Sequence, residues 1–463
     1  MKIHLSRAMN FCLMLFLTIF VLAETASAGF LYAVNDNAAG NMIYGFSVNE
    51  STGELTALAG FPIATGFNGG GSTNLEMLAI DKLNKRLYVI NRGSDNISAY
   101  SIDEATGMLS LLPFSPITSV AQQRTIKVHP SGSPLIVGAD TFASFNITAK
   151  AATPAAGSPY AMPANVSPTA SIMTHDGGYY YAGGNSGNFF AGYSIDQATG
   201  VMTPISGSPF DSGNATPNPT AIDASGRLYV INSRQALVRV YTLAAGVPTP
   251  VTNSPFSGTM TGFSAQGKVH PNGQFFALSN RTRNHFFVHL ISGTGASTEL
   301  TVMKGSPVET GGTSSLMNEF NDDGTLFFSG NGTSRNVSSF KVDPATGAFS
   351  DRIVQAVNTM GDAGSLTGMG YVNFAAAAQS VTVAGRVIMK NGIGVSRALV
   401  SFTNELGETR SVTTNSFGHY KFEDLLTGEH YTIDVRQRRD IVLTQPLNLE
   451  GELLDLDLTI PLN

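Results

Sequence analysis

The sequence predicts an all-β protein: a seven-bladed β-propeller followed by a small β-sandwich. Three observations support this fold class. A string of the Leu-Tyr-Val-x-Asn kind recurs along the chain, turn residues punctuate the intervals between its copies, and short alternating segments fill the tail. The copies begin at positions 31, 87, 136, 181, 228, 276 and 327, so they lie about 45 to 56 residues apart. Intervals of this length built of short β-segments are typical of propeller blades, and seven copies predict seven blades.

Each interval contains the parts of a four-stranded blade. Turns such as His129-Pro-Ser-Gly precede the strings, because Pro, Asn, Asp and Gly set the dihedral angles of tight turns. A second turn carries Thr-Gly, whose glycine we expect at positive φ. The fourth strand runs into a Ser-Pro or Phe-Pro dipeptide. Since proline cannot donate to a β-ladder, we expect it where the outermost strand ends and the chain crosses to the next blade. These prolines are Pro62, Pro116, Pro159, Pro209, Pro255 and Pro307.

The two ends of the repeat region predict how the ring closes. The chain enters the first repeat at a second strand, Phe30–Val34, with no inner strand before it. An extra inner strand, Leu366–Val372, follows the seventh blade and has no blade of its own. We therefore expect these two segments to pair and to join the ends of the propeller, which spans residues 29–374.

The N-terminus predicts export. Lys2 and Arg7 precede an apolar run, and Ala26-Ser27-Ala28 follows it as a small-x-small cleavage site, so residues 1–28 are predicted to be a secretory signal peptide. We expect a periplasmic or extracellular protein without stable membrane insertion after cleavage. The only cysteine, Cys12, lies in this segment. The mature chain then has no disulfide, no thiolate metal site and no cysteine nucleophile.

Charge and composition narrow the function classes. The net charge is −6 and only 13% of the residues are charged, so nothing indicates a basic surface for nucleic acid. The histidines recur at turn positions of the repeats, which favours a structural role over catalysis. His285 and His289 lie on one face of a strand, but no neighbouring acidic residue or cysteine completes a metal site. The sequence predicts neither a metal nor another cofactor.

The tail differs in composition from the propeller. About 11% of residues 29–379 are charged, against about 23% of residues 380–463, and we place a linker at 375–380 and a sandwich at 381–463. Gly385-Arg-Val, the segment Thr413-Thr-Asn-Ser-Phe-Gly and the turn before Tyr431-Thr432 resemble the carboxypeptidase regulatory-like domain. That resemblance covers essentially the whole tail and implies a non-catalytic accessory module.

The propeller, from Phe30 to Phe374, resembles the YVTN and lactonase-like family of seven-bladed propellers. The resemblance rests on the LYVIN strings, the Thr-Gly turns and the Ser-Pro-Phe exits. Lactonases of this family, which include 6-phosphogluconolactonases, are expected to carry His and Arg near inner strands, and Glu and Arg after second strands. Arg281 matches the last of these positions and is the one candidate catalytic residue. Pro219-Thr220 stands where Arg-His is expected, Ser233 stands where Glu is expected, and Pro168 to Ala170 offers no histidine.

Residues that follow the second strands are the candidate ligand-binding groups. Asn91 and Asn280 end two of the recurrent strings, Arg92 and Arg281 come directly after them, and Arg234 follows a third string. The arginines would form a cationic half-ring that accepts an anion, or they are solvated turn residues. The asparagines either present their amides at one mouth of the channel or cap strand ends through local hydrogen bonds.

The sequence leaves three interpretations of function. The first is an exported binding or scaffold protein, whose ring presents one face to a protein, a glycan or a small anionic ligand. The alternative is an extracytoplasmic lactonase-like hydrolase that acts on a sugar lactone. A third is a purely structural component of the envelope or surface. Because only Arg281 matches, the sequence favours the binding protein. The lining of the channel discriminates between them: convergent ionisable groups favour the enzyme, and a lining of Asn, Ser and Gly favours the binding platform.

Overall fold

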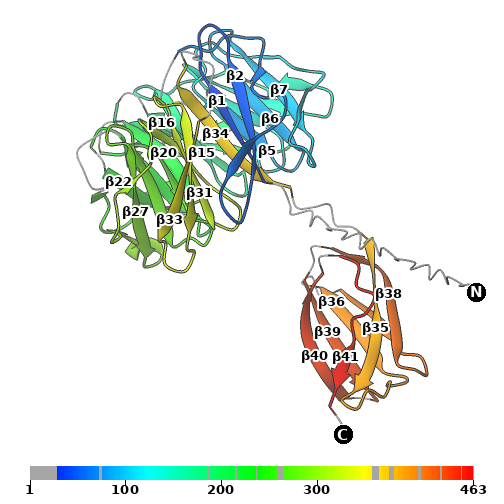
Figure 1. The fold of residues 1–463 in the computed structure, drawn as a ribbon. Helices are drawn as coiled ribbons and strands as arrows, with labels where there is room; N and C mark the ends of the chain where they lie inside the picture. Colours follow the sequence, from blue (N-terminus) through cyan, green and yellow to red (C-terminus); the bar gives the residue numbers. More distant parts are fainter. Residues whose placement is uncertain are drawn as a thin grey trace, which may run out of the picture. The chain divides into compact units, whose positions relative to one another are not determined.

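In the computed structural model, the regular secondary structure of the described residues is β-strand apart from one short 3-10 helix, and it is arranged in two compact units (Figure 1). One unit is the propeller and the other is the C-terminal sandwich. The structure describes residues 29–71, 76–184, 187–213, 216–235, 237–257, 264–356, 364–374, 380–404, 408–427, 430–438, 440–449 and 451–461. The predicted signal peptide and most of the predicted linker lie outside these residues. No helix among the described residues has the length and apolarity needed to cross a membrane.

Seven antiparallel sheets form the seven blades, which confirms the predicted fold class. The inner strands are β34 (Leu366–Asn373), β5 (Leu78–Asp81), β10 (Thr125–Val128), β15 (Pro168–Met173), β20 (Pro217–Ile222), β25 (Ser264–Val269) and β30 (Ser315–Phe320). The second strands are β1 (Gly29–Asn35), β6 (Arg86–Asn91), β11 (Leu135–Gly138), β16 (Tyr179–Gly184), β21 (Leu228–Asn232), β26 (Phe275–Asn280) and β31 (Leu326–Asn331). The third strands are β2 (Met42–Val48), β7 (Asn96–Ile102), β12 (Thr141–Ile147), β17 (Phe189–Ile195), β22 (Leu237–Ala244), β27 (His285–Ser292) and β32 (Asn336–Val342).

The outer edges contain the remaining propeller strands. The fourth strands are β3 (Leu55–Ala57), β8 (Leu109–Leu111), β13 (Ala152–Pro154), β18 (Met202–Pro204), β23 (Val247–Pro250), β28 (Glu299–Val302) and β33 (Phe349–Ala356). Six blades add a two-residue strand: β4 (Ile63–Ala64), β9 (Ile117–Thr118), β14 (Tyr160–Ala161), β19 (Phe210–Asp211), β24 (Phe256–Ser257) and β29 (Val308–Glu309). A short 3-10 helix, Gly295–Ser297, precedes β28.

The ring closes as the sequence predicts. β34 pairs antiparallel with β1, with Phe30 opposite Val372 and Ala33 opposite Met369, so the last strand supplies the inner strand of the first blade. The side chain of Ser339 in the seventh blade also donates to the carbonyl of Gly53 in the first blade, at 2.6 Å. That glycine has φ of 77°, as expected for the Thr-Gly turn.

The prediction for the proline dipeptides is wrong in one respect. After β3 the chain does not leave the blade at Pro62. It turns back, and β4 pairs with the beginning of β2 while β3 pairs with its end. In five other blades the serine before the proline accepts a hydrogen bond from a backbone N–H of the third strand, at 2.9 to 3.2 Å. The serine therefore satisfies the N–H that the interrupted outer strand leaves open.

Apolar second strands and turn histidines hold the blades together. Leu87, Tyr88, Val89 and Ile90 of β6 are fully buried, because both faces of the strand pack against other blades or sheet layers. His270 donates from Nε2 to the carbonyl of Gly324 in the next blade at 3.0 Å. His175 makes the same kind of bond to the carbonyl of Ile222. These contacts confirm the structural interpretation of the turn histidines.

The C-terminal unit is a two-sheet sandwich, as predicted. One sheet has the order β38 (His419–Leu426), β35 (Ser380–Met389), β41 (Leu458–Ile460), with β41 parallel to β35. The other has the order β37 (Thr409–Thr413), β36 (Leu399–Asn404), β39 (His430–Gln437), β40 (Asp440–Asn448). Phe402 and Phe422 meet in its core with ring centroids 4.5 Å apart. β35 already begins at Ser380, a residue that we expected in the linker.

Candidate functional site

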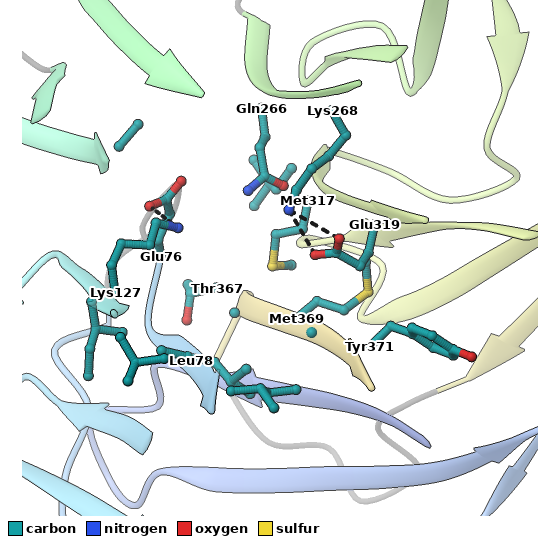
Figure 2. Close-up of a pocket in the computed structure, with 18 of the residues that line it drawn as sticks. Glu76, Leu78, Lys127, Gln266, Lys268, Met317, Glu319, Thr367, Met369 and Tyr371 are labelled. Atoms are coloured by element: carbon teal, nitrogen blue, oxygen red, sulfur yellow. Dashed lines mark hydrogen bonds and ion pairs between the residues drawn. The ribbon is translucent and has the colours of Figure 1, made fainter. Parts of the chain in front are cut away.

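The central channel of the propeller contains a cavity of about 250 Å³ (Figure 2). Its lining comes from the inner strands β5, β10, β15, β25, β30 and β34, together with Glu76 just before β5. Side chains alternate along a strand, so every second residue of an inner strand faces the channel. On β25 these are Gln266 and Lys268, and on β30 they are Met317 and Glu319. The inner strands therefore bring polar groups from distant blades around one small space.

Two lysine–glutamate ion pairs lie on opposite sides of this cavity, as Figure 2 shows. Lys127 Nζ lies 2.9 Å from Glu76 Oε2, and Lys268 Nζ lies 2.9 Å from Glu319 Oε2. The four side chains are only 11 to 27% exposed, so water screens these pairs less than it screens surface pairs. The lining thus has several convergent ionisable groups, which is the pattern that favours the enzyme.

The two carboxylates differ in the oxygen atoms they leave available. Both oxygens of Glu319 accept hydrogen bonds from Lys268 Nζ, at 3.1 and 2.9 Å. In contrast, Glu76 accepts through Oε2 from Lys127, from the backbone N–H of Ser171 at 3.1 Å and from the Ser171 hydroxyl at 3.3 Å. Among the described residues every contact of this carboxylate goes to Oε2. Oε1 of Glu76 is therefore available to a water molecule or a ligand.

β34 contributes polar groups of a different kind. Thr367 is fully buried, lines the cavity, and has no hydrogen-bond partner for its hydroxyl among the residues that the structure describes. The hydroxyl of Tyr371 donates to Glu50 Oε1 at 2.7 Å. Burial raises the pKa of Tyr371, and the adjacent Glu50 raises it further, so the tyrosine remains a neutral donor. Burial also raises the pKa of Glu50, against the hydrogen bonds from Tyr371 and Asn321.

None of the five predicted ligand-binding residues lines this cavity. Arg92, Arg234 and Arg281 each follow a second strand, so they lie at the mouth where the inner strands begin. The guanidinium of Arg92 donates to Gln122 Oε1 at 2.7 Å, Arg281 is half-buried, and Arg234 is exposed. Glu76 also lies at the beginning of an inner strand, so it shares this mouth with the arginines. The role of the arginines as an anion site stays a prediction.

The asparagines are buried and bonded within or between blades. Asn91 is fully buried and donates to Asn96 Oδ1 and Ser98 Oγ, both at 2.8 Å, and it accepts from Asn41 at 3.0 Å. Asn280 is 2% exposed and accepts from the Thr282 hydroxyl. These contacts favour the strand-capping interpretation, because the amides are engaged before any ligand arrives.

The other positions compared with the lactonases have structural partners. The Thr220 hydroxyl is bonded to both the carbonyl and the N–H of Gly267, at 3.0 and 2.7 Å. Ser233 Oγ donates to Thr216 Oγ1 at 2.9 Å. Thr169 and Ala170 line the cavity but carry no ionisable group. Among the described residues no three His, Cys, Asp or Glu side chains gather in a way that could hold a metal ion, and the expected lack of a cofactor stays a prediction.

Comparison with known proteins relates the propeller to lactonases. A family model described as "Lactonase, 7-bladed beta-propeller" matches residues 22–158. A candidate 6-phosphogluconolactonase from Bacteroides fragilis is similar in structure, with a TM-score of 0.60 and 17% identity over 75% of this chain and 99% of its own. The periplasmic gluconolactonase of Pseudomonas aeruginosa has a TM-score of 0.57 and 16% identity over 74% of this chain and 99% of its own.

A protein from Lactobacillus plantarum is equally similar in fold, with a TM-score of 0.60 and 15% identity over 75% of this chain and all of its own. No curated protein is significantly similar to this chain in sequence. At these identities the structural likeness establishes the propeller fold alone. The matched family model and these structures do not test whether the C-terminal sandwich is a carboxypeptidase regulatory-like domain. That resemblance stays a prediction.

Proposed function

We propose that the propeller is a lactonase-like hydrolase that opens a sugar lactone in its central channel. The observation that carries this proposal is the pair of lysine–glutamate contacts facing each other across a cavity of about 250 Å³. Lactone hydrolysis requires a base that activates water and a cation or donor that stabilises the oxyanion. The channel lining contains both kinds of group. The match to the lactonase family model supports the same reaction class, whereas the comparisons give the scaffold interpretation no support.

Glu76 is the proposed general base. It lies at the mouth, and its Oε1 has no hydrogen bond or ion pair among the described residues, so a water molecule can donate to it. The Ser171 N–H and Lys127 fix the other oxygen and so orient the carboxylate. Glu76 takes a proton from water as the oxygen of that water attacks the lactone carbonyl carbon. The ester C–O bond of the ring then breaks, and the proton passes to the leaving ring oxygen to give the hydroxy acid.

Lys127 and Lys268 are the proposed electrophilic groups. An ammonium group in a half-buried site stabilises a developing oxyanion more strongly than it does in water. Lys127 is the nearer of the two to the proposed base, since it contacts Glu76 directly. Lys268 lies on the opposite wall and is suited to orient the hydroxyl groups of the sugar ring.

The test is the turnover of glucono-1,5-lactone by the purified chain and by Glu76→Gln. The substitution keeps the size of the side chain and removes the base, so we expect kcat to fall by about 10²- to 10⁴-fold. Glu104→Gln is the matched control, because Glu104 pairs with Lys85 on the surface and lies outside the channel. Arg281→Ala tests the sequence-based candidate in the same assay. Equal kcat values for the wild type and Glu76→Gln would contradict the assigned role, and no turnover by the wild type would refute the proposed activity.

A further inference from the structure

We infer that the channel selects an uncharged, polyhydroxylated lactone and discriminates against one that carries a phosphate group. This inference rests on the proposed function and names its substrate class. It follows from how the charges of the lining are arranged. Four charged side chains line the cavity, and they are two lysines and two glutamates.

Each ammonium group in the cavity already has a carboxylate partner. The two Nζ–Oε2 distances are both 2.9 Å. Each wall of the channel therefore has one positive and one negative side chain, and its formal net charge is zero. Within the described lining of the cavity, a phosphate would meet only cations that already have a carboxylate partner. It would have to separate a pair and would then lie beside the released glutamate, which is unfavourable in a poorly solvated site. The lining therefore disfavours a phosphorylated sugar.

The neutral groups of the lining suit sugar hydroxyls. Thr367 lines the cavity, and its buried hydroxyl has no hydrogen-bond partner within the described part of the chain, so the channel wall contains an unsatisfied neutral donor and acceptor. The side-chain oxygen of Gln266 accepts from the backbone N–H of Asn318 at 2.7 Å, which fixes the amide on the channel wall. Met317 and Met369 line the cavity beside the Lys268–Glu319 pair, where they can pack against the C–H groups of a ring (Figure 2).

The size of the cavity agrees with a single sugar ring. Pockets for drug-sized ligands have volumes of about 300 to 1,000 Å³, and this cavity has about 250 Å³. The volume therefore agrees with one sugar ring, and the discrimination against phosphate rests on the charges of the lining.

The experiment compares kcat/KM for glucono-1,5-lactone and for its 6-phosphate, in the wild type and in Glu319→Gln. The variant keeps an oxygen that can accept from Lys268 and gives the channel a net positive charge. We expect the wild type to prefer the neutral lactone by at least tenfold, and Glu319→Gln to reduce or reverse that ratio by at least tenfold. Glu319→Asp keeps the charge and is the control, whose preference for the neutral lactone should persist. A wild type that prefers the phosphorylated lactone, or a ratio unchanged in Glu319→Gln, would overturn the inference.

A separate binding measurement keeps the two proposals distinguishable. If neither lactone is hydrolysed, the proposed activity fails, and titration calorimetry with inorganic phosphate then decides the question of charge selection. We expect Glu319→Gln to bind phosphate at least tenfold more tightly than the wild type and Glu319→Asp. Equal phosphate affinities in all three proteins would show that the paired lysines do not govern selection.

Discussion

Replacing Arg227 with methionine should destabilise the propeller far more than removing a surface charge. Arg227 and Asp223 lie at the turn before β21 and are 7% and 2% exposed. Arg227 Nε contacts Asp223 Oδ2 at 2.5 Å, and Arg227 Nη1 donates to the Thr298 hydroxyl at 2.9 Å. The methionine keeps most of the apolar side-chain volume but leaves the Asp223 carboxylate buried without its cation.

The expected cost is about 3 to 5 kcal/mol, the range measured when one member of a buried ion pair is removed. The hydroxyl of Tyr229 and two backbone N–H groups still donate to Asp223, which limits the loss. A propeller of this length has an unfolding entropy of about 0.7 kcal/mol/K, so the melting temperature should fall by about 4 to 7 °C. Differential scanning calorimetry of the full chain measures this shift.

Two further variants decide whether the buried charge is the cause. Lys85→Met breaks the surface ion pair between Lys85 and Glu104, whose side chains are 45% and 40% exposed. The free energy of unfolding should fall by less than about 1 kcal/mol. The double variant Asp223→Asn with Arg227→Met removes both charges and should be more stable than Arg227→Met alone. The reasoning is refuted if Arg227→Met melts within the range of the surface control, or if the double variant is the less stable of the two.

Two other predictions concern pH and export. Burial lowers the pKa of His289 from 6.5 to about 4. Between these pH values the unfolded chain binds a proton that the folded chain excludes. The folding stability is therefore fully present above pH 6.5 and decreases as the pH falls towards 4. In His289→Leu the free energy of unfolding should fall by up to about 3 kcal/mol less than in the wild type between pH 7.5 and 4.5. Urea denaturation at these two pH values measures the difference. Identical pH profiles for the two proteins would contradict the role of His289. We also propose cleavage after Ala28 and release outside the cytoplasm; N-terminal sequencing of the exported product should begin at Gly29, and a product that begins at Met1 would disprove it.

The sequence predicts the propeller well because the same strand and turn pattern recurs in every blade. Seven strings with similar spacing determine the blade count, and the position of the unmatched strand 366–372 determines the closure that the β1–β34 pairing confirms. The prolines are less informative. A proline lacks the backbone N–H and so indicates that the β-ladder is interrupted. It does not indicate whether the chain then crosses to the next blade or turns back to the third strand of its own blade. In five blades the return is accompanied by a hydrogen bond that the serine accepts from the third strand, and this tertiary contact cannot be read from the dipeptide.

The charged lining of the channel is absent from the sequence-based candidates, because these all lie at or just after the ends of second strands. One ion pair could have been predicted from the spacing of its residues in the sequence. Lys268 and Glu319 lie 51 residues apart, about one repeat, and both are the fifth residue of an inner strand, so adjacent blades bring them together. The other pair has no such signal, because Glu76 precedes β5 and Lys127 is the third residue of β10. Pairing across blades depends on the register of each inner strand, which the repeat spacing alone does not give.

The divided outer strands have a consequence for how the protein behaves at high concentration. An exposed strand edge is a template on which another chain can add a strand, and this is a common route to aggregation. In six blades the edge consists of one strand of three or four residues and one of two, with a proline between them, so no continuous row of backbone donors is presented. β33 of the seventh blade is the exception, since it runs unbroken for eight residues. Its register is interrupted near Asp351, whose φ of 50° bends the strand, and Asp351 and Arg352 are exposed charges on that edge. Under conditions that screen charge, self-association of the folded protein should therefore begin at the seventh blade.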